Sequence, residues 1–192
     1  MHSESVNTSP GAGVADASDA PIGEIDPSRL RRARWGVMLF FLLAGWIFAP
    51  WAVRIPDIKR HIGADDGIFG LVLLGMAGGS IVAMSTAGWL SSYIGSKRLA
   101  LVGGLGVCVL AVTLGLAPSP MTLFFTLALF GAFYGLMDVA MNTQAVVVEQ
   151  LYQRPIMSSF HGGFSFATLT GALLGALLVQ HLSTVMHLLL TG

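Results

Sequence analysis

The sequence predicts an all-α membrane protein with about five transmembrane helices and the start of a sixth. Hydrophobic residues make up 54% of the 192 residues and charged residues only 10%, and the mean hydropathy is +0.75, whereas soluble domains are roughly one quarter charged. The uncharged residues also gather in long runs, each close to the roughly 20 residues that a helix needs to cross a bilayer. Short polar or proline-containing links separate these runs.

Residues 1–28 are expected to form a disordered cytoplasmic tail. They contain no Lys or Arg, are rich in Ser, Gly, Pro and Ala, and carry the acids Glu4, Asp16, Asp19, Glu24 and Asp26. Such a composition buries too little apolar surface to offset the entropy lost on ordering. A secretory signal would need a basic start followed at once by an apolar stretch, and this segment has neither.

Residues 29–192 are expected to form one transmembrane helical bundle. Its links are the charged segment from Arg54 to Asp66, the pair Lys97 and Arg98, the Pro118-Ser119-Pro120 turn, the polar segment 149–154 and the turn at 180–183. Proline removes a backbone donor and restricts the residue before it, so the two prolines divide one long uncharged run into two helices. The expected spans are approximately 35–54, 67–95, 99–117, 121–148 and 156–179. Residues 184–192 are too few to cross and are expected to begin a partial sixth helix.

The basic residues predict the orientation of this bundle. With the N-terminus inside, the cytoplasmic segments hold Arg29, Arg31, Arg32, Arg34, Lys97, Arg98 and Arg154, and the outer segments hold Arg54, Lys59 and Arg60. Cytoplasmic loops carry an excess of Lys and Arg. We therefore expect a multi-pass protein whose N-terminus is cytoplasmic.

The fourth span carries a stripe of small and polar residues. Gly131, Gly135, Asp138, Asn142, Ala145 and Glu149 follow one another at steps of three or four, which places them on one helix face. Asp138 lies near the membrane midplane, where a carboxylate costs roughly 2.5 to 3.5 kcal/mol, so it should be paired, protonated or hydrated through a cavity. Two interpretations stay open: Asp138, Asn142 and Glu149 belong to a solute or proton pathway, or they hydrogen-bond a neighbouring helix.

Spans five and one carry further candidates. His161 shares a face with Ser165 and Thr168, and because histidine titrates near neutrality it is a candidate proton relay or else a structural histidine. In the first span, Trp46 and Arg54 lie on one face with Pro50, which permits a kink. Both are candidates for lining a cavity; the alternative for Arg54 is that it snorkels to the interface.

Glycine and alanine repeats predict where helices pack closely. Gly75, Gly79, Ala83 and Ala87 recur at strict four-residue steps, and Gly171 and Gly175 form a second pair. Small residues at this spacing let two helix backbones approach each other in a membrane. We expect both sets to be packing surfaces.

Several function classes are disfavoured. Ten basic and ten acidic side chains cancel, so no basic surplus is available to bind nucleic acid. The sequence has no His-rich or carboxylate-rich cluster for a metal and no glycine-rich phosphate loop after a strand, so we expect no metal and no cofactor. It has no G-x-S-x-G nucleophile elbow. We therefore expect that the protein is not an enzyme.

Two segments resemble the major facilitator superfamily. Gly88, Leu90, Gly95, Lys97 and Arg98 match the signature of the inner loop between the second and third spans, although Ser92 stands where that signature has aspartate. Residues 135–142, followed by Glu149 and residues 157–162, look like spans four and five of a bacterial, fucose-permease-like branch. The resemblance covers about residues 30–190.

This resemblance implies a twelve-helix transporter made of two six-helix bundles, with the substrate held between them near the midplane. The chain would supply the N-terminal bundle, and a C-terminal six-helix bundle or a second chain would complete it in a bacterial inner membrane. Spans one, four and five line the cavity in that family, and Gly88, Gly95, Lys97 and Arg98 would form a gating loop. The implied partners are the lipid bilayer, a small solute and protons.

The leading hypothesis is a secondary active transporter, proton-coupled and specific for a small polar or sugar-like solute, that works by alternating access. One alternative is an exporter of drugs or toxic compounds. Another, from a different class, is a truncated membrane fragment or interaction subunit that transports nothing. In the leading hypothesis, proton uptake and release at Asp138 bias the side to which the cavity opens.

Overall fold

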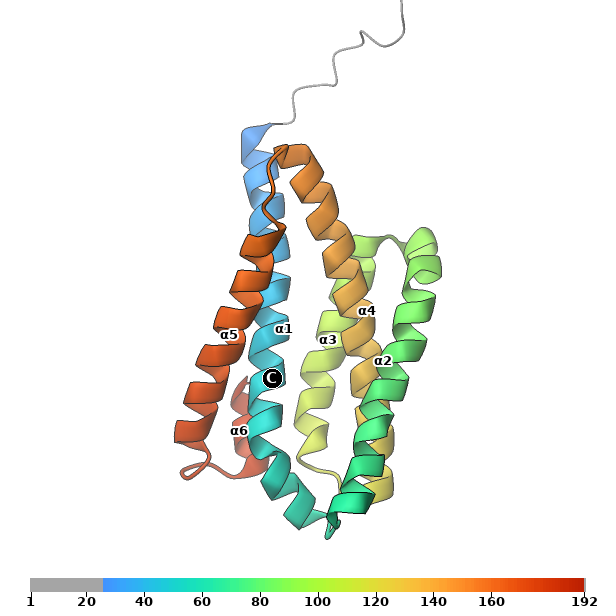
Figure 1. Cartoon of the computed structure of the whole chain (residues 1–192), viewed down its shortest axis with the longest axis vertical. Coiled ribbons are helices and arrows are strands. Elements are labelled where there is room, and N and C mark those ends of the chain that lie inside the picture. Colours follow the sequence, from blue (N-terminus) through green and yellow to red (C-terminus); the bar gives the residue numbers. More distant parts are fainter. Residues whose placement is uncertain (1–25, 192) are drawn as a thin grey trace, which may run out of the picture.

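The structure is a computed structural model that describes residues 26–191, and all regular elements in this range are helices (Figure 1). They are α1 (Pro27–His61), α2 (Asp66–Ile94), α3 (Ser96–Leu114), α4 (Pro120–Tyr152), α5 (Met157–Leu178) and α6 (Thr184–Thr191). Within the described range, α1 to α5 are long and apolar enough to cross a membrane. The predicted fold class, an all-α membrane protein with five spans and a short sixth helix, is confirmed.

Helix α1 extends beyond the expected first span at both ends. It begins at Pro27, so residues 27 and 28 are helical, and residues 1–25 of the expected tail lie outside the described residues. Asp26 caps the helix, because its side chain accepts the backbone N–H of Ser28 at 2.9 Å. At the other end the helix continues through the segment expected to be a link and stops at His61. The basic residues in that last turn interact favourably with the negative end of the helix dipole and so stabilise the end of α1.

The joint between α2 and α3 is shorter than the inner loop predicted by the sequence. Residues from Gly88 to Ile94 remain helical, and Gly95 alone separates the two helices. Gly95 has φ +81°, a conformation that residues with a Cβ rarely adopt. One glycine is therefore enough to turn the chain, and Lys97 and Arg98 fall in the first turn of α3.

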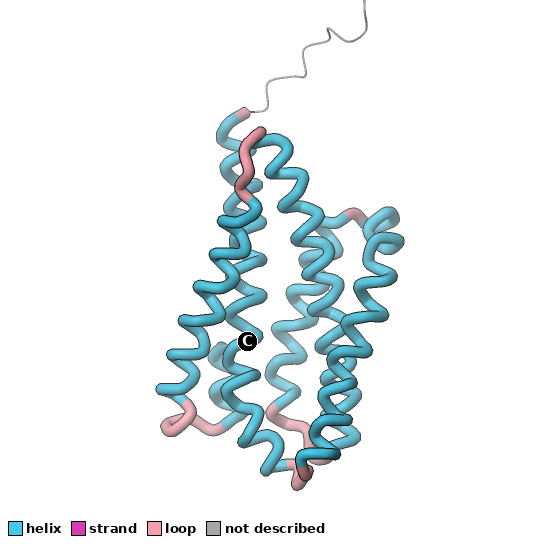
Figure 2. Tube along the Cα trace, viewed as in Figure 1, coloured by secondary structure: helices cyan, strands magenta, loops and turns pink. Residues whose placement is uncertain are grey.

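The helices pack as two groups (Figures 1 and 2). Helices α2 and α3 both pack along α4, and α1 packs along α5 with smaller contacts to α3 and α4. The α2–α4 contact is a backbone contact: a Cβ at Gly79 would overlap the carbonyl of Ala128, and a Cβ at Gly135 would lie 3.0 Å from the Ser80 carbonyl oxygen. The predicted packing roles of Gly79 in α2 and of Gly171, which packs against Ala49 in α1, are confirmed.

The links gather at two ends of the bundle. Figure 1 shows the start of α1, the α2–α3 joint and the α4–α5 link at one end, which we call the N-terminal end. The α1–α2, α3–α4 and α5–α6 links lie at the opposite end. Between the ends, Leu71, Ile81, Leu105 and Leu173 are more than half exposed on α2, α3 and α5. Apolar faces of this extent suit contact with lipid.

Candidate functional site

A cavity of about 330 Å³ lies where the two groups of helices face each other. Four helices contribute to its wall, and most of the lining is apolar or aromatic. The lining residues are Phe41 from α1; Met76, Ser80 and Met84 from α2; Tyr134, Gly135, Asp138 and Met141 from α4; and His161 and Phe164 from α5. Two of the residues singled out in the sequence, Asp138 and His161, thus border the same space.

Asp138 is held by its own helix. Asn142, one turn further along α4, donates from Nδ2 to the Asp138 backbone carbonyl at 2.9 Å and to its Oδ1 at 3.3 Å. Asp138 is half-buried and lines the cavity. A carboxyl group with one amide donor and an open side can still exchange a proton or bind a polar solute.

His161 is held by aromatic neighbours. Its ring stands at 81° to that of Phe41 with 5.2 Å between the ring centroids, and Phe41 in turn stacks on Phe160 at 5.5 Å. Edge-to-face and stacked contacts of this size restrict the orientation of a ring. His161 is exposed and lines the cavity. Its ring is therefore oriented by packing while its polar edge remains accessible.

Two polar residues of the cavity were not singled out as site residues. Tyr134 donates its hydroxyl proton to the Ala44 carbonyl at 3.3 Å, which links α4 to α1. Ser80 donates to the Gly131 carbonyl at 3.0 Å, which links α2 to α4. Tyr134 precedes Asp138 by four residues, so helical spacing could have placed it on the same face. The place of Ser80 depends on how α2 packs, and the sequence carries no signal for it.

Glu149 lies at the N-terminal end, outside the lining of this cavity. Its Oε2 accepts the backbone N–H groups of Ile156 at 2.7 Å and Met157 at 2.5 Å. These are the first donors of α5, and its N-cap residue, Ile156, supplies no side-chain hydrogen bond. The carboxylate of α4 therefore caps α5 and fixes the link between the two helices.

Trp46 and Arg54 also lie away from the main cavity. Trp46 lines a separate apolar cavity of about 400 Å³ between α1 and α5, beside Leu43, Phe166 and Thr170. Arg54 is 2% exposed at the opposite end of the bundle, where it contacts the α5–α6 turn and α6. The structure thus brings Asp138, Asn142 and His161 together and leaves Trp46, Arg54 and Glu149 apart from them.

The residues expected to form a gating loop lie at the N-terminal end. Lys97 and Arg98 are exposed in the first turn of α3, and Gly88 lies in open space on α2. Lys97 borders a cavity of about 370 Å³ together with Arg32 and Gln144. Gln144 donates from Nε2 to the Ser96 hydroxyl at 2.5 Å, which joins α4 to the start of α3.

Residues 33–192 match the family model of the Major Facilitator Superfamily. The chain belongs to this superfamily. Members of the Major Facilitator Superfamily are membrane carriers and not enzymes, in agreement with the absence of a nucleophile motif in the sequence. The resemblance noted in the sequence is therefore confirmed at the level of the superfamily.

Three bacterial proteins are similar to the chain. The chain is 41% identical over 134 residues to an uncharacterised MFS-type transporter of Yersinia pestis. This alignment covers 70% of the chain and 35% of that protein. It is 39% identical over 141 residues to the uncharacterised transporter y4wD of Sinorhizobium fredii, an alignment that covers 73% of the chain and 36% of that protein. It is 37% identical over 131 residues to the membrane protein MosC of Rhizobium meliloti, an alignment that covers 68% of the chain and 32% of that protein.

These alignments span about a third of the length of each curated relative, at 35%, 36% and 32%. No solved structure matches the chain. The superfamily assignment therefore rests on the family model and on these three proteins, and it agrees with the five membrane-spanning helices of the described residues.

Proposed function

We propose that the chain forms the N-terminal bundle of a secondary active transporter of the Major Facilitator Superfamily. In this proposal it carries a small polar or sugar-like solute by alternating access and couples that movement to protons. The observation that carries the proposal is that Asp138 from α4 and His161 from α5 face one cavity of about 330 Å³ between four helices. A second bundle, in this protein or in a partner chain, would close the cavity on its open side.

The composition of the cavity favours proton coupling. Phe41, Met76 and Phe164 give the wall an apolar surface around the carboxyl group of Asp138. An ionised carboxylate in such surroundings inside a membrane is costly, and uptake of a proton removes that cost. Proton occupancy of Asp138 therefore changes the relative free energies of conformations in which the carboxyl group is buried or hydrated.

Each polar residue then has a role. Asp138 carries the proton, Asn142 orients its carboxyl group, and His161 relays the proton toward the N-terminal end. Tyr134 and Ser80 supply hydroxyl groups to a polar solute. The proposal also places Trp46, Arg54 and Glu149 on the pathway outside the main cavity, and assigns gating to Gly88, Gly95, Lys97 and Arg98.

The proposed location is a bacterial inner membrane with the N-terminus in the cytoplasm. The N-terminal end of the bundle carries Arg29, Arg31, Arg32 and Arg34 on α1, Lys97 and Arg98 on α3, and Arg154 in the α4–α5 link. The opposite end carries Arg54, Lys59 and Arg60. The first set is larger, which supports a cytoplasmic N-terminal end.

The test uses the chain reconstituted in vesicles together with the C-terminal bundle that completes it, and a panel of sugars and sugar alcohols. Solute-driven proton movement is followed with an entrapped pH dye, and accumulation with radiolabelled solute. Asp138→Asn should abolish accumulation driven by a pH gradient and leave solute exchange intact. Asp66→Asn is the matched control, because it makes the same chemical change to a side chain that is 98% exposed at the start of α2.

Three results would overturn the proposal. Accumulation that survives Asp138→Asn unchanged contradicts proton coupling at this residue. Extrusion of cationic dyes without movement of any sugar favours the toxic-compound exporter, and the absence of flux with every solute favours a membrane-embedded interaction subunit.

A further inference from the structure

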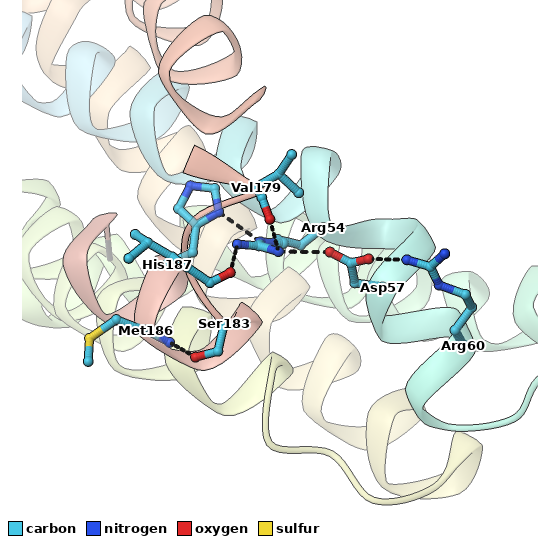
Figure 3. A network of polar contacts seen from close by, with 8 residues as sticks. Arg54, Asp57, Arg60, Val179, Ser183, Met186 and His187 are labelled. Atoms are coloured by element: carbon cyan, nitrogen blue, oxygen red, sulfur yellow. Dashed lines mark hydrogen bonds and ion pairs between the residues drawn. The ribbon is translucent and has the colours of Figure 1, made fainter. Parts of the chain in front are cut away.

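The second polar cluster of the molecule surrounds Arg54 at the opposite end of the bundle (Figure 3). Its guanidinium group donates from Nε to His187 Nδ1 at 2.8 Å, from Nη1 to Asp57 Oδ2 at 2.8 Å and the Val179 carbonyl at 3.2 Å, and from Nη2 to the Leu182 carbonyl at 2.7 Å. We call this set, Arg54 with Asp57, His187 and the two carbonyls, the Arg54 clasp. It ties α1 to the end of α5 and to α6.

The Arg54 clasp is a built feature and not a surface contact. Arg54 is 2% exposed and His187 is fully buried. Val179 follows the last residue of α5, where free carbonyls and the helix dipole favour a cation. Four of the five N–H groups of the guanidinium group are used by the four bonds. The hydrogen bonds that join the α5–α6 turn and α6 to α1 therefore converge on one arginine.

The hydrogen bond from Arg54 fixes the protonation of His187. Because Nδ1 accepts the Arg54 N–H, it carries no proton, and the proton of the neutral ring is on Nε2. Nε2 is buried and has no hydrogen-bond partner among residues 26–191. It faces Gly175 of α5, where an added Cβ would lie 3.6 Å from Nε2 and 3.4 Å from Cε1. The close backbone of α5 thus holds the ring in place.

An imidazolium ring cannot take part in this arrangement. Both of its nitrogens are donors, so an N–H at Nδ1 would point at the Nε–H of Arg54, with only 2.8 Å between the two nitrogen atoms. Two positive charges would also meet in a buried site. The clasp and a protonated His187 therefore exclude each other.

The charged groups around His187 do not relieve this conflict. From α1 it faces Arg54, with Asp57 behind the guanidinium group and Arg60 bound to the other oxygen of Asp57 (Figure 3). The charged or imidazole side chains of α3 and α5, which are Lys97, Arg98 and His161, lie at the far end of those helices, and α6 has no other titratable residue. His181 in the turn and His61 of α1, which lines the same cavity as Arg54, are both exposed. The single carboxylate of the cluster is thus already shared by two arginines.

Solvent reaches the cluster from one side. A cavity of about 670 Å³ at this end of the bundle is lined by Arg54, Asp57, Leu182 and Thr184, among others. Water in this cavity can deliver a proton to the edge of the Arg54 clasp when the turn fluctuates.

The geometry points to a proton-released clasp: while His187 is neutral, Arg54 holds the α5–α6 turn and α6 against α1, and protonation of His187 opens that contact. This inference rests on the contacts at the opposite end of the bundle and requires neither Asp138 nor the pathway role proposed for Arg54. It assigns to His187 the role of a pH sensor and to Arg54 that of a positioning residue.

The test measures one distance in the 192-residue chain in lipid nanodiscs. Spin labels are placed at Gln180→Cys in the α5–α6 turn and at Gly70→Cys on α2, an exposed position with open space, in a Cys108→Ala background. At about pH 8 the distance distribution should be narrow. Burial and the Arg54 guanidinium group lower the pKa of His187, so the acid sample is taken at about pH 4, well below the ordinary histidine pKa of about 6.5, and a second, broader population should appear there. An identical distribution at both pH values would overturn the inference.

Two variants show which histidine responds. His187→Asn replaces Nδ1 by an amide oxygen that accepts a hydrogen bond and does not titrate, so its distribution should stay narrow at both pH values. His181→Asn is the matched control in the adjacent turn and should keep the full response. A pH response retained in His187→Asn, or lost in His181→Asn alone, would contradict the assignment.

Nitrogen-15 spectra of histidine in the unsubstituted chain give a test that needs no variant to fold. At about pH 8 the signal coupled to Arg54 Nε should show the neutral tautomer with its proton on Nε2. Conversion to imidazolium at about pH 4 should remove that coupling. The opposite tautomer, or an imidazolium with an unchanged label distance, would refute the clasp.

Discussion

Glu149 near the end of α4 accepts the backbone N–H of Met157, the first residue of α5, at 2.5 Å. The same carboxylate oxygen accepts the N–H of Ile156. The first N–H groups of a helix have no acceptor within that helix, and for α5 the acceptor comes from the preceding helix in the chain. This contact couples the end of the helix that carries Asp138 to the start of the helix that carries His161.

Glu149→Ala should destabilise the bundle by about 1.5–3 kcal/mol, the range for hydrogen bonds to a charged group. Glu149→Gln should cost less, because its amide oxygen still accepts. Thermal unfolding in detergent, followed by circular dichroism, measures both. Gln150→Ala changes an exposed neighbour and should leave the midpoint in place. Equal midpoints for Glu149→Ala and Gln150→Ala would show that the cap contributes nothing.

Adjacent glycines on α2 offer a second comparison. A Cβ at Gly79 would overlap the Ala128 carbonyl, whereas a Cβ at Gly78 would meet nothing within 4 Å. Gly79→Ala should therefore force α2 and α4 apart at a cost of about 1–3 kcal/mol. Gly78→Ala should be neutral or slightly stabilising, since alanine has the higher helix propensity. Thermal unfolding of the pair under one condition decides the point, and a Gly79→Ala variant as stable as Gly78→Ala would contradict close backbone packing.

The hydrogen bond from Gln144 to Ser96 predicts a coupling between α4 and α3. Helix α3 has no side-chain cap of its own, so this bond secures its first residue. Gln144→Leu should cost about 0.5–1.5 kcal/mol. In a double-mutant cycle with Ser96→Ala, the two effects should not add. Thr143→Ala, at an exposed neighbour, is the control, and full additivity in the cycle would exclude the contact as a source of stability.

The spans could be predicted from the sequence because a helix that crosses a membrane needs a run of about 20 uncharged, apolar residues, and such runs are visible in the sequence. The ends of the helices could not, because charge alone does not distinguish a polar loop from a polar helix end. Arg54, Asp57 and Arg60 were placed in a link by their charge, yet they lie in α1 and bind one another at helical spacing. In the same way one glycine, Gly95, replaced an expected loop.

The site was predictable to the extent that its residues share a helix. The spacing of Asp138 and Asn142 places them on one face, and they are hydrogen-bonded in the structure. Partners from different helices are not encoded in any spacing: the hydrogen bond between Arg54 and His187 joins residues 133 positions apart. Helical periodicity predicts which face of a helix is buried, but it does not predict which other helix packs against that face. That choice follows from the packing of the whole bundle.

The start of α1 gives a pH-dependent prediction. Asp26 accepts the side chain and the backbone N–H of Ser28, and these hydrogen bonds hold the pKa of its carboxyl group below the ordinary value. A group whose pKa is lower in the folded state stabilises that state fully above its unfolded pKa, about 3.9 for aspartate, and loses this contribution as the pH falls through the lower value. The first turn of α1 should therefore fray in acid while the transmembrane part of the helix does not.

Hydrogen exchange of the first-turn amides, from Arg29 to Arg32, measures this fraying. The protection of these amides from exchange is compared above and below about pH 4, after correction for the intrinsic exchange rate at each pH. Asp26→Asn retains a side-chain oxygen that caps the helix and does not titrate, so its protection should be the same on both sides of that pH. Asp65→Asn is the control, because Asp65 caps α2 and not α1. If Asp26→Asn lost protection in acid as the unsubstituted chain does, the carboxyl group of Asp26 would not be the cause.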